Sequence, residues 1–234
     1  MKLTIYIPTY QRYELDNCLA SIMSQITDDV EVIVSDNDPN GFARHIAARF
    51  DNIEYQSRII NIGCDPNCLL GTTQGTGEYV WIIDDDDWLL DGAVAATLEM
   101  CDGVVDRIIH YTPSCGEVPV GYIGAINGML DLLHDKSFLL AATCDSVNIW
   151  RRNIFDLSLG IKHLDTHNVL AWTGLKCVTM KVADRPLVKA APAVRGTHPS
   201  FESVMTDYLD ALSAYHNLPP LVFADVNKWN FAQP

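Results

Sequence analysis

Four consecutive aspartates, residues 84–87, directly follow the apolar run Tyr79–Ile83. Like charges packed this closely at the end of a buried strand repel one another unless a positive partner compensates them. A divalent cation is the natural partner, because carboxylate oxygens are among its preferred ligands. The alternative is a solvated acidic turn that caps a helix beginning near Asp91. The abrupt change from strand to carboxylates favours a metal site.

Polar residues also end the first two predicted strands. Pro8 and Thr9 close an apolar run near the N-terminus, where backbone groups and the Thr9 hydroxyl could contact a base and a ribose. Asp36 closes the second run and offers a carboxylate acceptor to an imide N–H such as that of uracil. An Asx turn is the alternative role, and it suits Asp38 better than Asp36.

Strand and helix patterns alternate through the first hundred residues, which predicts parallel strands joined by helices. Such a sheet is covered on both faces and binds ligands at the carboxyl ends of its strands, so the polar strand ends should meet at one edge. The expected strands are 3–7, 30–34, 53–57 and 79–83, and the expected helices are 13–26, 42–50, 67–74 and 93–100.

The second half of the chain is less regular. With 234 residues, 48% of them hydrophobic, the chain can bury one substantial core, and we expect a single domain over residues 1–234. The patterns of the second half predict strands at 107–112, 145–150 and 177–182, helices at 166–174 and 201–215, and a loop or hairpin at 113–124.

Composition limits the kinds of partner. A net charge of −14 argues against nonspecific binding to nucleic acid or to anionic membranes, both of which require clustered Lys and Arg. The seven cysteines are scattered without C-x-x-C or zinc spacing, which indicates reduced, mostly packed thiols. The start of the sequence lacks signal-peptide character and no long apolar stretch follows, so we expect a cytoplasmic protein without an integral membrane segment.

Four motifs in order resemble those of family 2 glycosyltransferases, the inverting nucleotide-sugar enzymes of GT-A fold. They are IPTYQR (7–12), EVIVSDNDPNG (31–41), NIGCDPN (61–67) and GEYVWIIDDDDWLL (77–90), and the match is thin beyond residue 90. The resemblance implies an α/β fold, a GT-A-like Rossmann-type sandwich with a mostly parallel central sheet flanked by helices. Residues 1–100 would then bind the nucleotide sugar, and residues 101–234 would bind the acceptor and carry the catalytic base.

The resemblance also implies roles for single residues. Asp36 would read the base. In the family pattern D-x-D-D, Asp86 would coordinate the metal and Asp84 would contact the ribose, the metal or metal-bound water. Hard oxygen ligands with room for phosphates suit Mn²⁺ or Mg²⁺ rather than zinc. The remaining donor-binding residues are Pro8, Thr9, Tyr10, Arg12, Asn61, Gly63 and Asp85.

An inverting displacement needs a general base that takes the proton of the acceptor hydroxyl. The resemblance places Asp165 in this role, just before a helix, although the usual acidic residue in front of it is Leu164 here. A helix cap is the alternative role for Asp165, and Asp156 and Asp145 are the other candidates for the base. His198 is a candidate for an additional metal or phosphate contact, with an ordinary loop histidine as the alternative.

The sequence therefore predicts a metal-dependent inverting glycosyltransferase that uses a nucleoside-diphosphate sugar, UDP-linked by resemblance. The sugar, the acceptor and the oligomeric state are left open, and the acceptor could be a glycan, a small molecule, a protein or a modified nucleobase. A sugar-nucleotide nucleotidyltransferase is one alternative, but no glycine-rich phosphate loop follows the first strand. A non-catalytic nucleotide-sugar-binding protein is the other.

Overall fold

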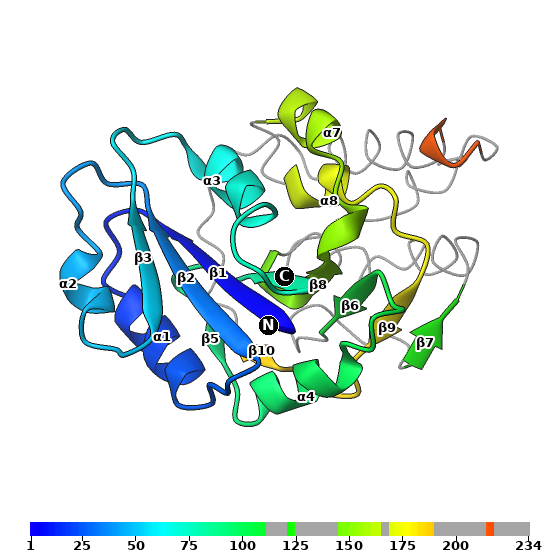
Figure 1. Ribbon diagram of the computed structural model, residues 1–234, viewed down its shortest axis with the longest axis horizontal. Helices are drawn as coiled ribbons and strands as arrows, with labels where there is room; N and C mark the ends of the chain where they lie inside the picture. The colour runs from blue at the N-terminus through cyan, green and yellow to red at the C-terminus, as the bar shows by residue number, and fades with distance from the viewer. Residues whose placement is uncertain (111–120, 125–144, 165–168, 190–213, 218–234) are drawn as a thin grey trace, which may run out of the picture. The chain divides into compact units, whose positions relative to one another are not determined.

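The computed structural model describes residues 1–110, 121–124, 145–164, 169–189 and 214–217 (Figure 1). Residues 1–194 form one compact unit that holds every strand named below, and residues 195–234 form a second unit, of which only 214–217 are described. The single domain expected from the sequence stays a prediction. The strands are β1 (Leu3–Thr9), β2 (Val30–Asp36), β3 (Ile53–Ser57), β4 (Tyr79–Ile82), β5 (Trp88–Leu89), β6 (Arg107–Ile109), β7 (Gly121–Ile123), β8 (Asn148–Arg151), β9 (Met180–Val182) and β10 (Val188–Lys189).

In the described part of the chain, the main sheet has eight strands in the order β3-β2-β1-β4-β8-β6-β9-β7, and β5 pairs with β10 separately. The strands β3, β2, β1 and β4 are all parallel, as expected for the first half. Strand β8 runs antiparallel to both of its neighbours, and β7 runs antiparallel to β9. The α/β class is therefore confirmed, with a sheet that is parallel from β3 to β4 and mixed beyond β4.

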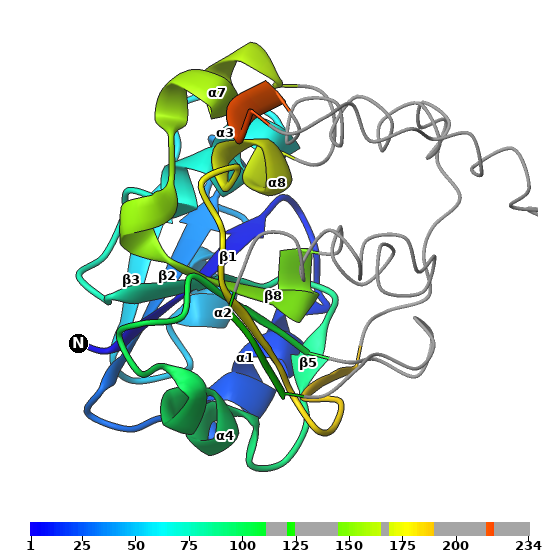
Figure 2. The same cartoon turned by 90° about the vertical axis from the view of Figure 1, so that its right-hand side faces the viewer.

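Helices cover both faces of this sheet, as both views show (Figures 1 and 2). Alternate residues of β1 explain why: Ile5 and Ile7 pack in the core beneath α1, whereas Tyr6 packs on the opposite side with α3 and α8. The helices are α1 (Leu15–Met23), α2 (Arg44–Ala47), α3 (Cys64–Gly71), α4 (Ala93–Met100), α7 (Leu157–Lys162) and α8 (Val169–Thr173), with 3-10 turns η2 (Asp145–Val147) and η3 (Arg152–Ile154).

The elements expected in the first half agree with the sequence pattern to within three residues, whereas residues 145–147 of the expected strand 145–150 form the 3-10 turn η2. Helix α4 spans the residues expected for it, whereas α3 begins three residues earlier than expected. Gly63 precedes α3 with a φ of 91°, a conformation that only glycine adopts readily, so the chain enters the helix directly at Cys64. Helix α7 was not expected. Its N-cap is Asp156, whose side chain accepts a hydrogen bond from the Ser158 amide.

The amino ends of the parallel strands are held by a dense polar network. The Glu31 carboxylate accepts hydrogen bonds from the Thr4 hydroxyl (2.6 Å) and the Gly77 amide (2.8 Å), and it also accepts one from the Thr76 amide. The Arg152 side chain donates to the Gly77 carbonyl (2.7 Å) and the Thr4 hydroxyl (2.8 Å). These bonds join β1, β2, β4 and the segment after β8 at one end of the sheet.

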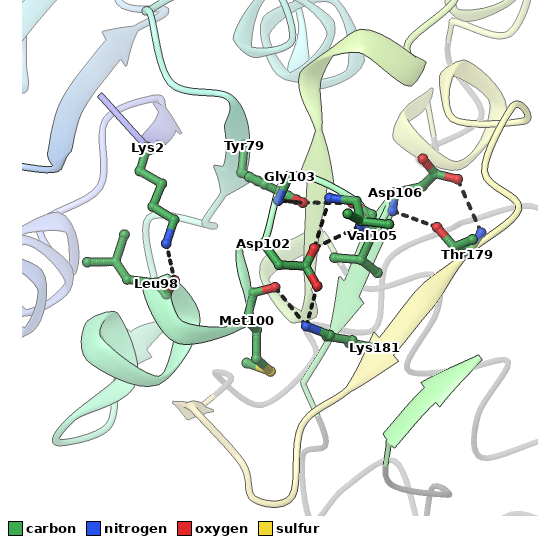
Figure 3. Close-up of polar contacts among 11 residues, drawn as sticks. Lys2, Tyr79, Leu98, Met100, Asp102, Gly103, Val105, Asp106, Thr179 and Lys181 are labelled. Carbon is green, nitrogen blue, oxygen red and sulfur yellow. Dashed lines mark hydrogen bonds and ion pairs between the residues drawn. The ribbon is translucent and has the colours of Figure 1, made fainter. Parts of the chain in front are cut away.

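A second network lies in the loop between α4 and β6 (Figure 3). Lys181 of β9 donates to the Asp102 carboxylate (2.6 Å), which also accepts from the Val104 and Val105 amides. The Tyr79 hydroxyl, at the start of β4, donates to the Val105 carbonyl (2.8 Å). Residues at the beginning of β4 are thereby joined through this loop to β9.

Candidate active site

The opposite, carboxyl ends of β1, β2 and β4 bring the predicted donor-binding residues together. Thr9 pairs with Asp36 across β1 and β2, and the acidic turn 84–87 follows β4 on the other side of β1. The Thr9 hydroxyl, which is buried, donates to Asp85 Oδ2 at 2.6 Å. Because β1, β2 and β4 are parallel, Thr9 and the four aspartates lie at one edge of the sheet, as the sequence indicated.

The four aspartates form a tight turn rather than a group of converging ligands. The Asp87 amide donates to the Asp84 carbonyl (3.1 Å), and the Asp84 amide donates to the Ser146 hydroxyl (2.8 Å). Burial raises the pKa of the Asp84 carboxyl well above its usual range, and the nearby Asp145 and the other three aspartates raise it further. The turn thus concentrates negative charge that requires compensation.

Asp85 lies inside this turn and is mostly buried. Burial raises its pKa to about 6, although the hydrogen bond from Thr9 and the positive charge of Arg12 act in the opposite direction. Asp86 is more exposed, with 21% of its side-chain surface accessible, and it forms an ion pair and a hydrogen bond with Arg12 Nη1. Arg12 Nε also lies 3.4 Å from Asp85 Oδ1.

Asp36, the residue expected to read the base, is completely buried and its carboxylate already has three protein donors. Oδ1 accepts from the Asp38 amide (2.8 Å), and Oδ2 accepts from the Ala43 amide (2.8 Å) and the Tyr55 hydroxyl (2.8 Å). The bond to Asp38 is the Asx-turn contact that we considered less suited to Asp36 than to Asp38. That expectation is wrong, because both aspartates accept from the amide two residues ahead.

The neighbouring Asn37 was missed by the sequence reasoning. It is 4% exposed, its amide donates to the Thr9 carbonyl (2.9 Å), and its Nδ2 donates to the Gly63 carbonyl (2.9 Å). Among the residues that the structure describes, its buried Oδ1 has no hydrogen-bond partner. Since a buried acceptor without a donor is costly, this atom is a candidate to receive a ligand N–H. Its position directly after Asp36, at a strand end, was the available signal.

The loop at 61–63 is attached to this position. Asn61 Oδ1 accepts from the Gly63 amide (2.9 Å), and the Gly63 carbonyl accepts from Asn37. Tyr10, beyond the end of β1, is 45% exposed and Pro8 is half-buried. The structure therefore brings Thr9, the loop at 61–63 and the acidic turn to the same edge of the sheet as Asn37.

The candidates for a general base differ in their surroundings. Asp165 and His198 lie outside the described residues. Asp156 caps α7, accepts from the Ser158 hydroxyl (2.7 Å) and lies 3.8 Å from Lys176, so its carboxylate is engaged in a structural role. Asp145 is close enough to Asp84 to raise its pKa, and burial, with Cys64 and Asp65, raises the pKa of Asp145 itself to about 8.

The carboxylates of the acidic turn fit a cation that takes only a few of its ligands from the protein. In the part of the chain that the structure describes, no three His, Cys, Asp or Glu side chains are grouped to hold a metal ion. Asp86 nevertheless presents a partly exposed carboxylate that already holds a positive group. Mn²⁺ and Mg²⁺ commonly use one or two carboxylates and complete their shell with phosphate oxygens and water.

The sequence model of "Glycosyl transferase family 2" matches residues 4–155, which is most of the chain, and the chain belongs to this family. The GalNAc(5)-diNAcBac-PP-undecaprenol beta-1,3-glucosyltransferase of Campylobacter jejuni is 33% identical over 104 residues, covering 42% of this chain and 34% of that protein. Abequosyltransferase RfbV of Salmonella typhimurium is 32% identical over 114 residues, covering 45% and 34%. The matched part thus spans about a third of each curated relative.

Solved structures show the same fold at low sequence identity. S. aureus TarS 1–349 in complex with UDP-GlcNAc has a TM-score of 0.63 at 16% identity, covering 92% of this chain and 66% of that one. The mannosyltransferase PcManGT of Pyrobaculum calidifontis, in complex with GDP-Man and Mn²⁺, has a TM-score of 0.59 at 17% identity, covering 94% and 66%. The expected GT-A-like α/β fold is confirmed. None of the helices described here has the length and apolar character needed to cross a bilayer.

Proposed function

We propose that this chain is a metal-dependent inverting glycosyltransferase that moves a sugar from a nucleoside-diphosphate sugar to an acceptor hydroxyl. The observation that carries the proposal is the meeting of Thr9, Asn37, Arg12 and the acidic turn at the carboxyl ends of three parallel strands. This is the edge at which open α/β sheets bind ligands. Membership of the family agrees with this assignment.

Base recognition is assigned to Asn37, and Asp36 is assigned the task of holding the loop that carries it. The bond from Nδ2 to the Gly63 carbonyl fixes the orientation of the Asn37 amide, so that Oδ1 is the free acceptor. An acceptor here pairs with the ring N–H of uracil, thymine or guanine, whereas cytosine and adenine have no such donor. We propose that the nucleotide is UDP, as in the solved TarS complexes, rather than GDP, as in the complex of PcManGT with GDP-Man.

The acidic turn and Arg12 would stabilise the nucleoside diphosphate as it leaves. Asp86 would hold Mn²⁺ or Mg²⁺, with Asp84 behind it as a second negative group. A bound cation of this kind neutralises the charge that develops on the leaving diphosphate. Arg12, which follows β1 and pairs with Asp85 and Asp86, would contact a phosphate oxygen. Thr9 keeps Asp85 oriented through its hydrogen bond.

Deprotonation of the acceptor hydroxyl is assigned to Asp165, with Asp145 as the second candidate because it lies close to Asp84. The acceptor class adopted here is a glycan, since the named activity of the C. jejuni relative concerns an oligosaccharide linked to undecaprenol. Asp165→Asn should preserve UDP affinity and lower turnover by about two to four orders of magnitude. Full turnover in this variant, with loss of turnover in Asp145→Asn, would transfer the role.

Calorimetric titration with UDP, GDP, CDP and dTDP in the presence of Mn²⁺ tests the donor assignment. We expect UDP to bind most tightly and CDP poorly. Asn37→Ala should weaken UDP binding about tenfold and leave the affinity for inorganic diphosphate, which has no base, unchanged. A preference for GDP would retain Asn37 as the acceptor and reject UDP, whereas a preference for CDP would reject Asn37.

Asp36→Asn separates the two neighbouring residues. Because Asp36 has three protein donors, we expect this variant to lose stability and to keep the order of nucleotide preference. A folded Asp36→Asn protein with a changed preference, beside an unaltered Asn37→Ala protein, would return base reading to Asp36. A non-catalytic binding protein would bind UDP in these titrations and form no product with any acceptor glycan.

A further inference from the structure

Arg12 lies across the acidic turn and pairs with the carboxylates of Asp85 and Asp86. Its Nη1 forms an ion pair and a hydrogen bond with Asp86 Oδ2, and its Nε is 3.4 Å from Asp85 Oδ1. The Arg12 side chain is 44% exposed, whereas those of Asp85 and Asp86 are 10% and 21% exposed. The guanidinium therefore covers the carboxylates from the solvent side, which is the side from which a ligand would approach.

The backbone before Arg12 has a conformation that directs the side chain to this position. Gln11 has a φ of 54°, in the left-handed region that residues other than glycine adopt at an energetic cost. The Gln11 side chain compensates by donating to Asp38 Oδ2 (3.1 Å). The turn after β1 is thus held by a long-range contact, and the placement of Arg12 on the aspartates follows from it.

Arg12 and a metal ion bound at Asp86 would compete for the same carboxylate. Oδ2 is the atom that Arg12 contacts, and a directly bound metal ion needs the same outward-facing group. Two like charges at one carboxylate also repel each other. The pKa of Arg12 reflects its environment: burial lowers it, but the charges of Asp85 and Asp86 outweigh burial and raise it.

We propose that Arg12 and the divalent cation are alternative partners of Asp86, so that Arg12 must leave the carboxylate before the metal ion can bind. This inference rests on the proposed function, which places the cation at Asp86. It predicts that the nucleotide-free protein binds the metal weakly. When the diphosphate enters, it supplies a new partner for the released guanidinium, and metal and nucleotide therefore strengthen each other's binding through the exchange of one side chain.

The experiment measures Mn²⁺ binding to the nucleotide-free protein from the EPR signal of free Mn²⁺. Arg12→Gln should bind Mn²⁺ about tenfold more tightly than the wild type, because the competing cation is gone. Arg49→Gln is the matched control: it removes another exposed arginine that is paired with an aspartate, Asp16, and it changes the net charge by the same amount. Its Mn²⁺ affinity should stay within about twofold of the wild type.

Repeating the Mn²⁺ titration with saturating UDP tests whether the metal ion replaces Arg12 at Asp86. UDP should increase the Mn²⁺ affinity of the wild type more than that of Arg12→Gln, because only the wild type has a guanidinium to release. Equal or weaker Mn²⁺ binding by nucleotide-free Arg12→Gln would overturn the proposal. So would an increase of the same size in Arg49→Gln, because total charge would then explain the effect.

Asp86→Asn separates failure of this inference from failure of the metal assignment. If Mn²⁺ binding is lost in Asp86→Asn and unchanged in Arg12→Gln, the cation is at Asp86 and only the exchange is wrong. If Mn²⁺ binding persists in Asp86→Asn, the cation does not use Asp86, and both the metal assignment and the exchange are wrong.

Discussion

The two ends of the same parallel strands have opposite character. At the amino end, Thr4 donates to Glu31, Glu31 also accepts from backbone amides, and Arg152 closes the network. At the carboxyl end, Thr9 makes the same kind of bond to Asp85, yet Asn37 Oδ1 has no partner in the described part of the chain. The network around Glu31 satisfies its polar groups internally, whereas the other end retains a buried acceptor and a half-exposed guanidinium.

This difference indicates where stability and binding are located in the fold. A network whose donors and acceptors are matched contributes to stability and offers nothing to a ligand. An end that keeps unmatched groups loses some stability and gains a site that a ligand can complete. Substitutions at the amino end should therefore alter unfolding, and substitutions at the carboxyl end should alter binding and turnover.

The largest expected effect is at the carboxyl end. Asp86→Asn should lower turnover with UDP-sugar by at least about 100-fold, because the cation that stabilises the leaving diphosphate would lose its carboxylate. The midpoint of thermal unfolding should change little, since Asp86 lies at the surface of the turn. Steady-state kinetics together with a thermal melt measure both quantities. Unchanged turnover, or a collapse in stability, would contradict the comparison.

Gly77→Ala tests the amino end. An added Cβ would lie 2.4 Å from the Thr4 backbone nitrogen and 2.6 Å from the Leu3 carbonyl carbon, so the backbone itself would have to move. We expect urea unfolding to show a loss of about 3 kcal/mol. The control is Gly92→Ala: the nearest atom would be Arg185 Nη2 at 3.5 Å, and a left-handed φ of 76° should cost only about 1 kcal/mol. Equal losses of unfolding free energy in the two variants would contradict the importance of the close backbone contact at Gly77.

Glu31→Gln tests how the free energy of unfolding depends on pH through the amino-end network. Desolvation alone would raise the pKa of Glu31, but hydrogen bonds from Thr4, Thr76 and Gly77 outweigh it, and the pKa lies below its usual value. A lowered folded-state pKa stabilises the protein above the unfolded-state value, and the benefit disappears as the pH falls through the folded-state pKa. The variant should be less stable by about 1–2 kcal/mol at pH 7. A difference that fails to shrink toward pH 3 in urea titrations would contradict this account.

The smallest effects come from two threonines of β1 that make equivalent bonds. Thr4 donates to Glu31 at 2.6 Å and Thr9 donates to Asp85 at 2.6 Å. Thr4→Val should lower the free energy of unfolding by about 1 kcal/mol and leave UDP affinity unchanged. Thr9→Val should weaken UDP binding in the presence of Mn²⁺ about fivefold. Calorimetry on both variants would refute the distinction if Thr4→Val weakened UDP binding equally.

Much of the first half of the chain could be predicted from local pattern. Strands β1 to β4 and helix α4 lie where alternation and helical spacing indicated, because each buries its own apolar face. The second half was harder. Strand β9 covers only Met180–Val182 of the expected 177–182, and helix α7 was missed, since short elements derive their stability from tertiary packing rather than from propensity.

The sequence by itself determined which elements form in the first half and which strand ends carry Thr9, Asp36 and the four aspartates. Only the tertiary structure decided which of these groups stay available to a ligand. Asp36 receives its donors from Ala43 and Tyr55, and Asp86 receives Arg12 from a loop 74 residues earlier in the chain. Hydrogen-bond partners are set by the packing of distant segments, so a local pattern that names a polar residue leaves open whether the fold or a ligand satisfies it.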